Sequence, residues 1–200
     1  EHRDGLDEQA QKDCEALYQR ATVLQEAGNL PEALLVYQQA REIDDRYAEV
    51  HYRIGQVLFS LGRYDEAETS FRQAVEEDVA PLRMLDSMQQ IVADIAVSED
   101  VPLIDFPGII REAYLQHYDH AVFGKEYFPD HVHTNMEGYR LLGLALFDYL
   151  ASQDIVIPDA SWNDARIDAV SEAVVAGLDP GAEAYTFINL GKVLDWAGKF

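Results

Sequence analysis

The fold is decided by two stretches that match each other 34 positions apart, Gly28-Asn29-Leu30-Pro31-Glu32-Ala33 and Gly62-Arg63-Tyr64-Asp65-Glu66-Ala67. The same shift pairs Ala21 with Gly55, Leu24 with Leu58, Tyr37 with Phe71 and Ala40 with Ala74. A fixed period of this length, with a glycine between two helical patterns, is typical of stacked helical repeats.

The residue types at these positions suit antiparallel helices joined by a tight turn. Gly28 and Gly62 fit the left-handed position that ends a helix. Pro31 fits the first turn of the next helix, where the missing N–H costs nothing. Ala33 and Ala67 are small enough for two helices to approach closely. We therefore expect helices at about 8–27, 31–43, 48–61 and 64–77, which form two repeats over residues 8–78.

These repeats resemble the tetratricopeptide repeat, although Asp45 and Val79 stand where that family usually has proline. The resemblance implies a groove that binds a protein or peptide partner. Some members of the family grip a C-terminal carboxylate with lysine, arginine and asparagine side chains, and we find no such set here. The acidic charge of the chain instead favours a basic segment as the partner.

The repeat pattern returns near the end of the chain. Leu190, Gly191, Leu194 and Gly198 align with Ile54, Gly55, Leu58 and Gly62. A helix is expected before them at about 162–177. We expect residues 160–200 to begin a second repeat unit that stops after one helix of its pair, so that the chain is truncated there.

Residues 79–152 lack the period and predict the C-terminal part of an α/β domain. A helix is expected from Pro81 to Ala96, with an inward stripe of Leu85, Met88, Ile91, Val92 and Ile95. The run Val101-Pro102-Leu103-Ile104-Asp105 predicts a buried parallel strand, and a mobile segment with Pro107, Gly108, Gly124 and Pro129 follows it. Thr134 and Glu137 predict a capping box for a final helix, which Leu142, Leu146 and Leu150 pack inward. The predicted fold class is mainly α, with repeats joined to this α/β portion.

Asp130 precedes His133 by three residues, just before the final helix. Residues three apart in a helical turn lie on the same side. Asp130 can therefore accept a hydrogen bond from one imidazole nitrogen of His133, which leaves the other nitrogen free as a general base. This is two-thirds of a Ser-His-Asp triad.

The stretches 101–105 and 128–139 resemble the end of the SGNH (GDSL-like) hydrolases, which carry an Asp-x-x-His motif before their last helix. The resemblance implies a serine hydrolase of carboxylic esters or O-acyl groups, with His133 as the general base and Asp130 orienting it. The family's nucleophilic serine stands in a Gly-Asp-Ser turn, and a glycine and an asparagine complete its oxyanion hole. No serine here has that context. These groups are therefore expected outside the chain, and residues 1–200 alone are predicted to be inactive.

Two other interpretations of the acidic and histidine residues remain open. Asp130 and His133 also suit a simple surface turn that caps a helix. A metal cluster of His117, His120, His131 and His133 with Asp119 and Asp130 fits no standard ligand spacing, so we expect neither a metal nor a cofactor. At the level of function, the alternative to a hydrolase fragment is a non-catalytic repeat scaffold for protein–protein interaction.

The composition excludes several classes of partner. Fifteen basic residues against 37 acidic ones give a formal charge of −22. Such a surface repels nucleic acids and anionic membranes. No apolar run approaches the roughly 18 residues of a membrane span. Cys14 has no partner for an internal disulfide, and the sequence does not indicate a compartment.

Overall fold

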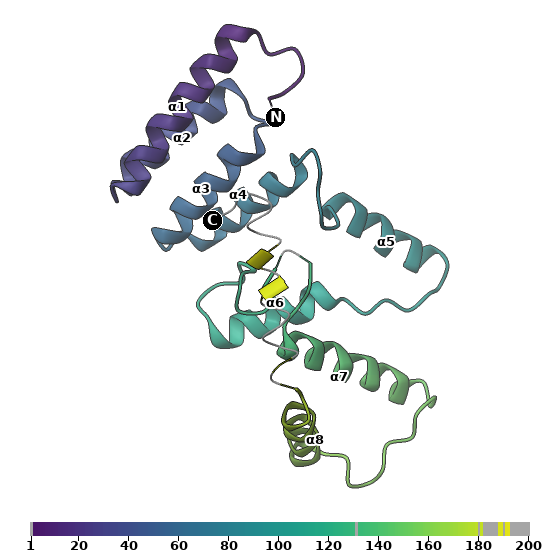
Figure 1. The fold of residues 1–200 in the computed structure, drawn as a ribbon. Coiled ribbons are helices and arrows are strands. Elements are labelled where there is room, and N and C mark those ends of the chain that lie inside the picture. Colours follow the sequence, from purple (N-terminus) through teal and green to yellow (C-terminus); the bar gives the residue numbers. More distant parts are fainter. Residues whose placement is uncertain (1, 131, 180, 182–187, 190, 193–200) are drawn as a thin grey trace. The chain divides into compact units, whose positions relative to one another are not determined.

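The structure, a computed structural model, describes residues 2–130, 132–179, 181, 188–189 and 191–192 of the 200. This part of the chain contains eight helices and no strand (Figure 1). The chain divides into two compact units, residues 1–124 and residues 125–200. The prediction of a mainly helical protein is confirmed, whereas an α/β portion is not observed in the described residues.

The first four helices are the expected repeats. They are α1 (Glu8–Glu26), α2 (Leu30–Ile43), α3 (Ala48–Ser60) and α4 (Tyr64–Glu76). Helix α1 packs against α2, α3 packs against α4, and α2 joins the two pairs by packing against α3. Gly28 and Gly62 occupy equivalent turns with φ of +77° and +72°. Both have the left-handed conformation that the sequence predicts for them, because only glycine adopts it without strain.

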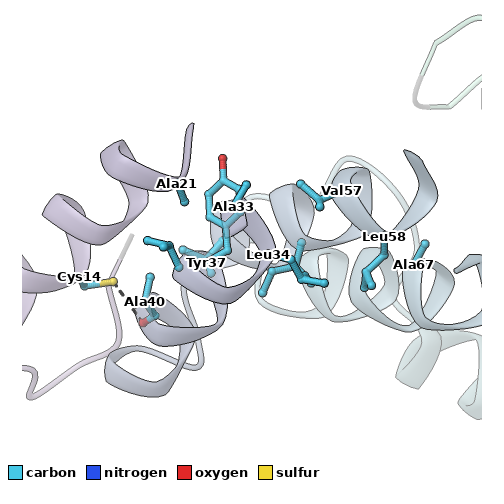
Figure 2. Packing of buried hydrophobic residues seen from close by; sticks show 12 residues of the cluster. Cys14, Ala21, Ala33, Leu34, Tyr37, Ala40, Val57, Leu58 and Ala67 are labelled. Carbon is cyan, nitrogen blue, oxygen red and sulfur yellow. Dashed lines mark hydrogen bonds between the residues drawn. The ribbon is translucent and has the colours of Figure 1, made fainter. Parts of the chain in front are cut away.

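The core of the repeats lies between these helix pairs (Figure 2). Ala21, Ala33, Ala40 and Ala67 are fully buried, as expected where helix backbones approach closely. Gly55, the partner of Ala21 in the period, allows a close approach of α3 and α4, since an added Cβ would lie 2.7 Å from the Phe71 ring. Tyr37 fills the equivalent space in the first repeat and is fully buried. Positions 34 residues apart therefore carry side chains of similar size, because they occupy equivalent places in the packing of the two helix pairs.

The rest of the first unit departs from the expected α/β pattern. Helix α5 (Asp86–Ser98) begins five residues after Pro81, and its predicted inward stripe is exposed at Met88, Ile91, Val92 and Ile95. Residues 101–105 form no strand, and Val101 and Leu103 are exposed. A strand requires a neighbour for its backbone groups, and the described part of the chain offers none. The strand prediction is wrong for this structure.

The predicted mobile segment instead contains a helix, α6 (Phe106–His117). The Asp105 carboxylate caps it by accepting a hydrogen bond from the Gly108 N–H at 3.0 Å. Pro107 lies in the first turn, where proline is tolerated. Ile110 and Tyr114 are fully buried, and Arg111 forms an ion pair with Glu68 of α4. The capping aspartate and the proline together mark the start of a helix where the sequence predicted a mobile segment.

The second unit contains α7 (Met136–Ser152) and α8 (Asp164–Ala176). Helix α8 confirms the helix expected at 162–177. The capping-box prediction is wrong, because Asn135 caps α7 while the Thr134 hydroxyl donates to the Tyr127 carbonyl. Leu146 is exposed rather than packed inward, and Phe147 contacts Trp162 at 4.8 Å between ring centroids. The repeat helix expected around Leu190, Gly191 and Leu194, in the second repeat unit, lies mostly outside the described residues. Within the described chain, no helix is long and apolar enough to cross a membrane.

Candidate functional site

The Asp130 carboxylate is held by the backbone of the turn that follows it. Its Oδ1 accepts hydrogen bonds from the N–H of Val132 at 2.7 Å and from the N–H of His133 at 2.6 Å. Both donors lie within three residues, so the local sequence alone closes this turn. The second oxygen, Oδ2, remains available for another partner.

That partner is the His133 ring, whose Nδ1 lies 2.9 Å from Asp130 Oδ2. The sequence prediction of hydrogen-bond contact between these two side chains is confirmed. The His133 side chain is 70% exposed, whereas that of Asp130 is 20% exposed. We expected the other imidazole nitrogen to face a cleft, but within the described residues the His133 ring is largely open to solvent.

The environment keeps Asp130 ionised. Burial by itself raises the pKa of the carboxyl group, but the two backbone N–H groups and the His133 ring outweigh it and lower the pKa to about 2. A carboxylate that accepts from Nδ1 selects the tautomer with a proton on that atom. The Nε2 atom of neutral His133 then carries the lone pair, as a general base requires.

The loop that follows the pair is joined to the start of α7 by contacts that the sequence did not predict. Asn135 donates its backbone N–H to the Tyr127 carbonyl at 2.7 Å and its side-chain amide to the Glu126 carbonyl at 2.7 Å. Its Oδ1 accepts from the Gly138 N–H. Thr134 packs so closely on Gly138 that any Cβ there would collide with the threonine. The preference of asparagine for helix N-caps was the available signal for this role.

The other candidate ligands do not form a metal site in the described residues. There, no group of three or more histidine, cysteine, aspartate or glutamate side chains is arranged to hold a metal ion. His120 packs among aromatic rings, with Phe59 and Tyr64 both 4.9 Å away between centroids. Its Nδ1 accepts from the Val122 N–H. His131 lies outside the described residues.

A second candidate site lies where α1 faces α3 in the repeats. We call it the tyrosine face; it consists of Glu15, Tyr18, Tyr47, Glu49 and Arg53. The Tyr18 hydroxyl donates to Glu49 at 3.2 Å, and the Tyr47 hydroxyl lies 3.5 Å from Glu15. Arg53 pairs with Glu49 at 3.0 Å. Burial, together with the negative charge of Glu15, raises the pKa of Tyr47 to about 12. The tyrosines therefore stay neutral and present rings and hydroxyl groups beside two carboxylates.

Comparison with known proteins bears on the repeats. Residues 12–76 match the family model described as tetratricopeptide repeat. The helix pairs of this segment are therefore similar to tetratricopeptide repeats. The match runs from within α1 to the end of α4, so it covers both helix pairs and the tyrosine face. No curated protein matches the chain. The resemblance of residues 101–139 to SGNH hydrolases stays a prediction.

Proposed function

We propose that the second unit supplies the general base of an SGNH-type serine ester hydrolase, with His133 as the base and Asp130 as the residue that orients it. The observation that carries this proposal is the 2.9 Å contact between Asp130 Oδ2 and His133 Nδ1, which leaves Nε2 free of this contact on a side chain that is 70% exposed. A turn that only capped a helix would not need the second carboxylate oxygen on the ring. Asn135, which caps α7, already performs the capping role.

In the proposed reaction, His133 Nε2 takes the proton of a serine hydroxyl as that oxygen attacks the ester carbonyl. The resulting imidazolium is stabilised by Asp130 and returns the proton to the leaving alkoxide. Water then releases the acyl group by the same route. The serine and the oxyanion donors belong to a part of the protein outside residues 1–200 in this proposal, since none of the seven serines here follows Gly-Asp.

The test is fluorophosphonate labelling of the complete gene product that contains residues 1–200. We expect a labelled serine outside this range, and labelling that is lost in His133→Gln. Residues 1–200 alone should hydrolyse p-nitrophenyl acetate no faster than free imidazole at equal concentration. Members of a triad act as a unit, so the isolated base retains little catalysis. A phosphonate-sensitive turnover by residues 1–200 would place the nucleophile within them, and a complete protein that resists labelling would refute the hydrolase proposal.

A second function is favoured by the tetratricopeptide match. We propose that the tyrosine face binds an extended basic segment of a partner protein, since stacked repeats present such surfaces to peptides. Glu15 and Glu49 would receive its lysine or arginine side chains. The double variant Glu15→Gln/Glu49→Gln should weaken binding of a proline-containing basic peptide by about tenfold. If the double variant bound the peptide with unchanged affinity in a titration, the tyrosine face would be excluded as the binding site.

A further inference from the structure

Helix α5 exposes an apolar face. Met88, Ile91, Val92 and Ile95 recur at the spacing of one helical stripe, and each is between 43% and 57% exposed. Within α5 the buried residue is Ala96. The start of the helix is tied to α4, because the Asp86 N–H donates to Glu76 at 2.7 Å. Helix α5 is therefore tied to the repeats at its start, while its apolar stripe is about half exposed within the described part of the chain. We call this stripe the α5 face.

A shallow groove of about 450 Å³ adjoins the C-terminal end of this face. It is lined by Ala93, Ala96, Val97, Asp100, Val101, Pro102 and Leu103. Most of its lining residues are apolar, and Asp100 is the acidic residue among them. Lysine and arginine combine a long apolar stem with a cationic head. The groove therefore suits one of these side chains better than a wholly apolar one.

Asp100 has a backbone conformation that favours glycine. Its φ is +54°, in the left-handed region where a helix usually ends with glycine. The Asp100 carboxylate has no hydrogen-bond or ion-pair partner among the described residues. It also lies beside the negative end of the α5 dipole. A negative charge without a partner among the described residues is thus carried by a residue that lines the groove and whose backbone conformation favours glycine.

The charge around the α5 face selects the kind of partner. Residues 84–110, which lie between Arg83 and Arg111, contain no lysine or arginine and five exposed acidic residues, Asp86, Asp94, Glu99, Asp100 and Asp105. Of these, Asp86 forms an ion pair with Arg72 at 3.6 Å. A second copy of the chain would bring these like charges together, which opposes self-association through this face. A cationic segment of another protein would instead be attracted by the same acidic side chains.

We propose that the α5 face and its groove dock a helical segment of a partner protein that carries lysine or arginine beside an apolar stripe. Apolar residues of that helix would cover Met88, Ile91, Val92 and Ile95, and one cationic side chain would enter the groove toward Asp100. This surface lies outside the tyrosine face and does not depend on the proposed hydrolase.

The probe is a synthetic amphipathic helical peptide of leucine and lysine, with leucines at i, i+3, i+4 and i+7, titrated into residues 1–200 by calorimetry. We expect one peptide per chain, with the affinity reduced about tenfold or more by Ile91→Glu and about fivefold by Asp100→Gly. Glycine suits the left-handed position, so Asp100→Gly removes the charge while it relieves the backbone.

The chain offers matched controls for both variants. Leu35→Glu changes an equally exposed apolar residue of α2, and Asp154→Gly changes an aspartate with the same φ of +54° after α7. Neither control should alter the affinity. Equal weakening by Ile91→Glu and Leu35→Glu, or equal binding of a peptide with glutamate in place of lysine, would overturn the proposal. So would sedimentation showing a dimer that Ile91→Glu dissociates, because a second copy would then cover the face.

Discussion

At the scale of single residues, the local sequence sets the chemistry of the described sites. Asp130 is held by the N–H groups of Val132 and His133, both within three positions of it. Short-range hydrogen bonds of this kind depend little on the rest of the fold. The Asp-x-x-His spacing therefore predicted the contact between the two side chains correctly, although it did not predict the open surroundings of the imidazole.

The lowered pKa of Asp130 predicts a pH dependence of its turn. Because the pKa is about 2 in the folded protein and about 3.9 in an unfolded chain, the turn gains stability that is fully present above pH 5 and lost as the pH falls toward 2. The amide protons of Val132 and His133 should shift with a midpoint near pH 2 in an NMR titration. Asp130→Asn should remove that transition. A midpoint near pH 4 in the unmodified protein would contradict the carboxylate geometry.

Cys14 predicts a second residue-scale behaviour. Its side chain is fully buried, and burial together with the negative charge of Asp44 raises the pKa of the thiol to about 11. Only the thiolate reacts quickly with alkylating agents. Iodoacetamide at pH 8 should therefore modify Cys14 slowly in the native protein and at the rate of a free cysteine in urea, as followed by mass spectrometry. Equal rates in the two conditions would show that this part of the core opens readily.

At the scale of elements, the helices are set by two different kinds of information. The four repeat helices begin and end within a residue of the expected positions, because glycine, proline and small residues recur at the 34-residue period. Helix α6 begins at its Asp105 cap and Pro107, whereas α5 has no side-chain cap and its Asp86 N–H donates to Glu76 of α4. The apolar run at 101–105 forms no strand. A strand depends on a neighbour elsewhere in the chain, whereas a helix satisfies its own backbone.

Two glycines inside helices provide a matched test of this packing. An alanine at Gly55 would bring its Cβ to 2.7 Å from the Phe71 ring, while nothing lies within 4 Å of a Cβ added at Gly143. Gly55→Ala should lower the free energy of unfolding by about 1–3 kcal/mol through overpacking. Gly143→Ala should raise the stability of α7 by about 0.5–1 kcal/mol, because alanine favours the helix. Hydrogen exchange at α3 and α7 measures the two effects separately, and a stabilising Gly55→Ala would show that Phe71 moves freely.

At the scale of the whole molecule, the distribution of buried apolar surface predicts uneven stability. The repeats bury Tyr37, Val50, Ile54 and Val57 almost completely, whereas α5 buries only Ala96. Regions with little buried apolar surface open at low free energy. Amides of α5 should exchange with solvent about 100-fold or more faster than those of α2 and α3. If the amides of α5 exchanged as slowly as those of α2 and α3 in a protein that sediments as a monomer, another part of the same chain would have to cover α5.

The sequence by itself determined the repeat. The period, the two left-handed glycines and the buried alanines follow from local geometry and from contacts between adjacent helices, which a short stretch of sequence contains. It also determined the Asp130–His133 contact, whose atoms lie three residues apart. Only the tertiary structure decided that the Thr134 hydroxyl donates to the Tyr127 carbonyl, that residues 101–105 form no strand, and that the stripe of α5 faces solvent. Each of these depends on which distant groups are present to accept a hydrogen bond or cover an apolar side chain, and sequence periodicity does not contain that information.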